Sequence, residues 1–221
     1  MSRCYLYVFI MSVVLLGTSM DVEAQEESSH SLSSSVFVSY STSNELRLIS
    51  ETTGNGENYV GYAYVELGTQ PFSNGDSYWA YAQMFWEQKF WQRPIYFHAE
   101  YRTLLADGGR DDNFYLGLAY TFGLDKGFVA LEPLYKYSRN GGHGMQFSVV
   151  GGCEWKYISL AYFSDIYRTS KMHVPLTMYN ECRLFFKVCP RFHTGIIGMM
   201  DYSFKNSIDV LSASVALKVN F

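Results

Sequence analysis

Apolar and polar residues alternate with a period of two along most of this chain, from residue 35 to its last residue. Aromatic and β-branched side chains recur at every second position, with small or polar side chains between them. This period is typical of a strand with one apolar and one polar face. We predict about twelve strands, within a range of ten to fourteen, at 35–41, 44–52, 58–68, 77–90, 94–105, 113–124, 127–138, 143–151, 154–168, 175–187, 191–204 and 208–221.

Clusters of Gly, Asn and Asp separate these runs, as at 53–56, 73–76, 107–112, 125–127 and 140–142. Gly and Asn accept the positive φ of hairpin turns, and Asp forms local hydrogen bonds to the backbone. No stretch beyond the N-terminal segment has helical periodicity, and the connections leave no room for crossover helices. The predicted fold class is therefore all-β, with the strands in an antiparallel up-and-down meander.

The faces of the predicted strands differ sharply in polarity. In the last run, positions 211, 213, 215, 217, 219 and 221 are all apolar, whereas Ser212, Ser214, Lys218 and Asn220 lie on the other face. The other runs follow this pattern, with Asn180 and Gln88 as exceptions on apolar faces.

Alternation alone fits two architectures. In a soluble sandwich or lipocalin-like barrel the apolar face points inward, whereas in a membrane barrel it points toward lipid. The predicted strands favour the membrane barrel, because 9–11 residues cross a bilayer at a tilt of ~45° and soluble strands average about 5–6. Aromatic residues near run ends, including Trp79, Phe122 and Phe128, are expected to form interfacial girdles. We predict a closed transmembrane β-barrel.

The N-terminus indicates export. Arg3 precedes the apolar run 5–16, and the triplet Val22-Glu23-Ala24 is typical of a cleavage site. A transmembrane anchor is the alternative, but that run is shorter than the ~20 residues of a spanning helix. The predicted organisation is a signal peptide at 1–24, cleaved after Ala24, a flexible polar lead at 25–34 and an outer-membrane barrel at 35–221, in a Gram-negative bacterium.

Composition narrows the set of partners. The formal net charge is −4, and no basic cluster is present, so nucleic acid is not an expected partner. Cys153, Cys182 and Cys189 lie outside the signal peptide. Their odd number and their spacing fit neither a disulfide framework nor a zinc site, so we expect passive thiols. No metal site or cofactor is predicted.

One segment resembles a known family. Residues 78–122 contain Glu87 to Trp91 after an aromatic-rich strand, then the His98 to Tyr101 strand (HAEY) and the Asn113 to Gly117 strand (NFYLG). They resemble the middle of the Tsx-like nucleoside-specific channel family, in an uncharacterised branch of small outer-membrane barrels. The resemblance implies a channel, with nucleosides as the solute. The final run ending in Phe221 resembles the last strand of such barrels, which implies recognition by the barrel assembly machinery.

The polar faces would line the lumen. The predicted solute pathway consists of Tyr64, Glu66, Tyr81, Gln83, Glu87, Lys89, His98, Glu100, Arg102, Tyr115, Glu132, Lys136, Asp165, Tyr179, Glu181 and Arg183. Charges of both signs imply pairing across a narrow pore rather than a simple anion or cation channel. The tyrosines suit stacking on a flat ring. For each of these residues, structural pairing is the alternative to solute contact.

We predict a monomeric barrel in outer-membrane lipid that passes small solutes by passive diffusion, without a cofactor. The first alternative is a non-conducting structural or adhesive barrel with a salt-bridged lumen. A barrel enzyme using His98 and Glu100 is the second. The chain has no G-x-S-x-G or H-E-x-x-H motif, so we predict no enzymatic activity.

Overall fold

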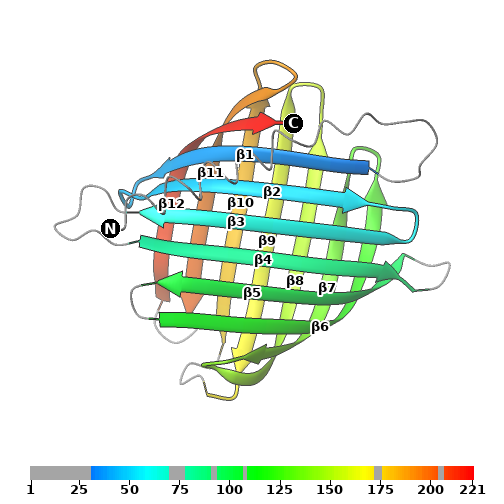
Figure 1. Ribbon diagram of the computed structural model, residues 1–221, viewed down its shortest axis with the longest axis vertical. Helices are drawn as coiled ribbons and strands as arrows, with labels where there is room; N and C mark the ends of the chain where they lie inside the picture. Colours follow the sequence, from blue (N-terminus) through cyan, green and yellow to red (C-terminus); the bar gives the residue numbers. More distant parts are fainter. Residues whose placement is uncertain (1–30, 70–77, 91–93, 107–108, 172–175, 204–206) are drawn as a thin grey trace, which may run out of the picture.

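The computed structural model describes residues 31–69, 78–90, 94–106, 109–171, 176–203 and 207–221. These residues form twelve strands that close into one antiparallel barrel in meander order (Figure 1). The strands are β1 (Ser31–Ser41), β2 (Leu46–Asn55), β3 (Tyr59–Thr69), β4 (Tyr78–Lys89), β5 (Ile95–Ala106), β6 (Gly109–Leu124), β7 (Gly127–Ser138), β8 (Gly142–Glu154), β9 (Ile158–Thr169), β10 (Thr177–Lys187), β11 (Phe192–Ser203) and β12 (Ser207–Asn220). The predicted fold class is confirmed.

The barrel closes where the first strand meets the last. β1 pairs with β12 in the register Ser35↔Asn220 to Ser41↔Ser214, and every other strand pairs with its neighbours in sequence. Closure leaves the sheet without an edge strand, as a lipid environment demands. Within the described residues, no helix is long and apolar enough to cross a membrane.

Two strands begin four residues earlier than predicted. β1 includes Ser31–Ser34, assigned above to the flexible lead, because these residues pair with Thr52–Asn55 of β2. β6 starts at Gly109, which has a φ of 123°. Arg110–Asp112 follow it and pair in register with β5. In both places the polar composition obscured the strand. Ala24 and the rest of 1–30 lie outside the described residues.

The apolar face of each strand points outward. In β12, Leu211 is 73% exposed and Val215 66%, whereas Ser212 and Ser214 are 4% and 3% exposed. The orientation is that of a membrane barrel, because the outside is apolar and the inside polar. The exceptions also have partners: Asn180 Oδ1 accepts a hydrogen bond from Tyr162 on the outer face, and Gln88 donates one to the carbonyl of Asn58.

The girdle prediction is wrong for Trp79. Its indole lies inside the barrel, against Gly68 and 5.5 Å from the Arg47 guanidinium. Trp79 alternates in phase with Tyr81 and Gln83, which line the same internal cavity. An aromatic residue near a strand end can therefore belong to either face.

Charge placed on the outer face should destabilise the barrel. We expect Val215→Lys to lower the free energy of unfolding in lipid vesicles by about 2–4 kcal/mol if the residue lies near the bilayer midplane. Val215→Leu is the control and should stay within about 0.5 kcal/mol of the parent. Urea titration of both variants measures the difference. Equal stability of the two variants would contradict an outward, lipid-facing Val215.

Candidate functional site

The inward faces of the described strands are mostly polar, and they line two cavities that bear on function. The first has a volume of about 480 Å³ and is lined by residues of β2–β5 and β7–β11. The second, of about 620 Å³, reaches Asn140 and Gly141 at the connection between β7 and β8. The two share Tyr81, Arg102, Leu104, Asp165 and Tyr179 in their walls.

Most of the predicted pathway residues line these cavities. The first cavity is lined by Tyr64, Glu66, Tyr81, Gln83, His98, Glu100, Arg102, Glu132, Asp165, Tyr179, Glu181 and Arg183. Tyr115 and Lys136 line the second. Glu87 is buried beside His98, and Lys89 is partly buried at the end of β4; neither is among the lining residues.

An ion pair crosses the interior where the two cavities meet. Arg102 of β5 donates to Asp165 of β9 at 2.5 Å and to Glu100 at 2.6 and 3.1 Å. Its guanidinium lies 4.6 Å from the ring of Tyr115. A guanidinium with two carboxylate partners and an aromatic face is held firmly. Arg102 and Asp165 thus lie in the wall that the two cavities share.

A second cross-lumen pair joins β10 to β2. Arg183 donates to Glu51 at 3.0 Å and forms an ion pair with Glu181. Glu51 also accepts from Lys218 at 2.7 Å and from Ser35 at 2.9 Å. Arg183 is 6% exposed, so this network fixes charges that water largely does not reach.

A third arginine inside the barrel, Arg47, was not among the predicted pathway residues. It bonds Glu66 at 3.3 Å and forms an ion pair with Glu45, and Tyr64 donates to Glu66 at 2.7 Å. Arg47 and Glu51 share the inward face of β2 with Ile49. Because Ile49 is apolar, the alternation in this strand did not show clearly which face is polar. Leu46 and Leu48 on the other face did indicate it.

The interior is not wholly polar. Phe37, Ile49, Tyr64, Phe185, Ile197 and Ala216 form a buried cluster inside the barrel. Phe37 and Phe185 meet edge to face with ring centroids 5.7 Å apart. Apart from Tyr64, these residues were not among the predicted lumen residues: a twelve-stranded barrel has a narrow interior, and apolar side chains fill part of it.

Aromatic rings of β3 and β4 form one wall of the first cavity. Tyr62 stacks on Phe85 at 5.0 Å, Tyr64 meets Tyr81 edge to face at 5.9 Å, and Phe85 stacks on His98 at 5.4 Å. All five line this cavity. This wall offers flat π faces beside the hydroxyl groups of three tyrosines, a combination suited to stacking and hydrogen bonding with a ring.

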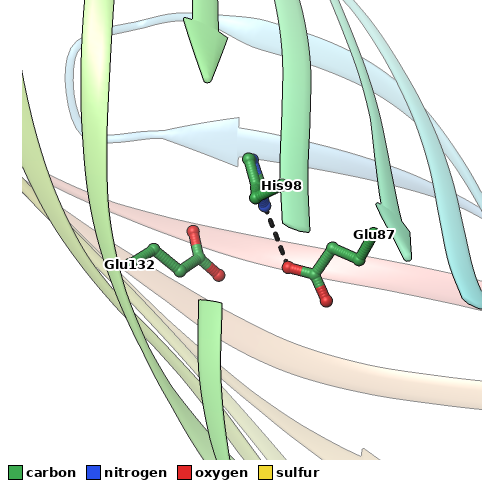
Figure 2. A group of neighbouring side chains, drawn as sticks. All are labelled: Glu87, His98 and Glu132. Carbon is green, nitrogen blue, oxygen red and sulfur yellow. Dashed lines mark hydrogen bonds and ion pairs between the residues drawn. The ribbon is translucent and has the colours of Figure 1, made fainter. Parts of the chain in front are cut away.

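Three buried side chains from separate strands converge in the interior. Glu87 of β4, His98 of β5 and Glu132 of β7 each offer a ligand atom within 4.8 Å of the others (Figure 2). His98 Nδ1 lies 2.9 Å from Glu87 Oε1, and its Nε2 lies 3.4 Å from Glu100 Oε2. No metal ligands are predicted from the sequence, because residues 87, 98 and 132 form no motif. The direct pairing of Glu87 with His98 emerges only from the register.

The described contacts of His98 do not form a nucleophilic site. Its two nitrogens face carboxylates, and its ring stacks on Phe85. Nucleophilic catalysis by a histidine base requires a hydroxyl or thiol within hydrogen-bond reach. In the described part of the chain, no such group is hydrogen-bonded to His98.

Comparisons with known proteins bear on the fold. No family model matches the chain, and no curated protein sequence matches it. Among solved structures, a NanC porin is similar with a TM-score of 0.57 and 12% identity, over 85% of this chain and 98% of that one. A KdgM porin is similar with a TM-score of 0.56 and 11% identity, over 86% of this chain and 99% of that one.

These likenesses show the fold, which is that of the outer-membrane porin barrels. With its apolar outer face and closed meander, the chain is an outer-membrane barrel of the kind found in Gram-negative bacteria. At 11–12% identity, the comparison carries no information on the solute.

Proposed function

We propose that this barrel is a narrow channel through which small, neutral, ring-containing solutes diffuse passively, with nucleosides as the solute class. The cavity of about 480 Å³ with its aromatic wall carries the proposal. Its volume lies within the range of about 300–1,000 Å³ typical of small-molecule sites. The resemblance of residues 78–122 to nucleoside-specific channels supports the same solute class.

The charges of the interior agree with a neutral solute. Arg47, Arg102 and Arg183 line the first cavity, and each is paired with two carboxylates. Paired charges leave little net field for a free ion, and they set the width of the pore. A neutral ring that stacks on Tyr62 or Phe85 would not need to break these pairs.

We also propose the setting of this channel. The protein works as a monomer in outer-membrane lipid, and Phe221 is read by the barrel assembly machinery. Connections 70–77 and 170–176 are longer than 90–94 at the other end. Longer loops are extracellular in such barrels. The β7–β8 connection, which the second cavity reaches, lies at the same end as these two long connections. The second cavity therefore opens toward the cell exterior.

Liposome swelling tests the channel. Vesicles carrying the purified, folded protein should swell faster in isotonic nucleosides than in sugars or amino acids. Tyr81→Leu, which removes a ring shared by both cavities, should reduce this preference. Tyr120→Leu changes an outward tyrosine (38% exposed) and should leave it unchanged. Swelling at the rate of empty vesicles for every solute would refute the proposal.

A non-conducting structural barrel is the second candidate. The two cross-lumen ion pairs, Arg102–Asp165 and Arg183–Glu51, together with the buried apolar cluster, favour it. Single-channel recordings in planar bilayers separate the candidates. Repeated absence of discrete openings from folded protein would establish the structural role, whereas steady openings would exclude it.

A further inference from the structure

We propose that Glu87, His98 and Glu132 bind one divalent first-row transition-metal cation, with zinc as the ion to test. This site is independent of solute transport, because a cation held at the lumen wall requires no flow through the barrel. One imidazole nitrogen and two carboxylate oxygens are a donor set that zinc accepts, with water as a fourth ligand.

The spacing of the donor atoms suits a small cation. The three ligand atoms lie within 4.8 Å of one another, and His98 Nδ1 is 2.9 Å from Glu87 Oε1. Zinc bonds of about 2.0–2.1 Å place neighbouring tetrahedral ligands about 3.3 Å apart. Glu132 approaches from β7 on the other side of the group (Figure 2), so a rotation of its side chain toward His98 and Glu87 would bring the three donor atoms to that separation.

Small residues on the intervening strand open the way for Glu132. β6 lies between β5 and β7, and its Gly117 pairs with His98 on one side and Leu134 on the other. A Cβ at Gly117 would meet the backbone oxygen of Pro133 at 2.2 Å. Ala119, the next inward residue, is fully buried. With a short alanine and no side chain at these positions, groups from β5 and β7 can meet.

Glu132 is the observation that points to a ligand. It is 6% exposed, and its carboxylate points toward Glu87 and His98 (Figure 2). Among the residues that the structure describes, none forms a hydrogen bond or ion pair with this carboxylate. A buried carboxylate without a partner is costly, and a bound cation would supply that partner.

The surroundings of His98 resemble the outer shell of a metal site. Metal-bound histidines usually donate their second ring N–H to a carboxylate, which fixes the tautomer. Here Nε2 faces Glu100 Oε2 at 3.4 Å, so Nδ1, which contacts Glu87 Oε1, is the nitrogen that would bind the metal beside Glu87. Glu100 is held in turn by Arg102. The charge of Arg102 is shared between Glu100 and Asp165. It therefore does not neutralise Glu87 and Glu132, whereas a bound divalent cation would neutralise both.

Zinc binding to the full folded protein tests the site. After removal of metal with a chelator, calorimetric titration with zinc should give one ion per chain. Glu132→Gln is nearly isosteric and should weaken binding at least tenfold, as should His98→Gln. Glu100→Gln should weaken it by about 10–100-fold, as loss of an outer-shell partner does. Zinc should also raise the unfolding temperature of the parent protein.

A matched histidine provides the control. His193 is also buried, at 4% exposure, and its Nε2 lies near Asn220 rather than near carboxylates. His193→Gln should therefore bind zinc as the parent does. Heat-modifiable gel migration shows that each variant is folded. A folded parent that binds no zinc, or folded Glu132→Gln and His98→Gln variants that bind it unchanged, would overturn the proposal.

Discussion

Replacing Arg183 with methionine is expected to lower the free energy of unfolding by about 3–5 kcal/mol, the usual cost of removing one partner from a buried ion pair. Glu51 and Glu181 would lose their shared guanidinium. Water could not fully replace it, because Arg183 is 6% exposed. In a conducting barrel the same change should raise single-channel conductance, since methionine is shorter than arginine and cannot bridge the interior to Glu51.

Urea unfolding in lipid vesicles measures the first effect, and planar-bilayer recording measures the second. Lys187→Met is the control, because its partner Glu154 is 70% exposed at the side chain. Loss of an exposed pair should cost less than about 1 kcal/mol. Equal costs for the two variants would show that the Arg183 network contributes no more than a surface pair.

Replacing Gly195 with valine should lower the free energy of unfolding by about 1–3 kcal/mol, because it overpacks the interior. A Cβ at Gly195 would lie 2.3 Å from the carbonyl oxygen of Leu184 and 2.7 Å from the ring of Phe185. Phe185 is 4% exposed in the buried cluster, so its ring has little room to withdraw.

Gly198 of the same strand is the matched control. No atom lies within 4 Å of a Cβ built there, and valine is favoured in strands. Gly198→Val should therefore leave the midpoint of urea unfolding unchanged or slightly raised. If Gly195→Val unfolds at the parent midpoint, Phe185 is not packed as described.

The strands that form the wall of the barrel could be predicted from the sequence, but the packing of its interior could not. Alternation at 211–221 correctly separated the lipid face from the inner face, since a period of two allows only two orientations. It missed the inward Phe185, because an apolar residue on a polar face does not change the period. It also missed Ser31–Ser34, whose pairing with β2 leaves no hydrophobic pattern.

Contacts across the interior could not be predicted for a different reason. The alternation of polar and apolar residues places Arg102 and Asp165 on the inner face of their strands. It does not show that they meet, because β5 and β9 are four strands apart. His98 and Glu132 lie on β5 and β7, with β6 between them, so the period of one strand does not relate them either. Such contacts form only when the whole barrel closes, so the pattern of a single segment does not predict them.

The two ion pairs that cross the interior have a mechanical consequence. Hydrogen bonds between strands resist sliding, but they do little to prevent a thin-walled tube from flattening. Arg102–Asp165 ties β5 to β9, and Arg183–Glu51 ties β10 to β2. These ties act as internal braces, so the cross-section should keep its shape under the lateral pressure of the bilayer.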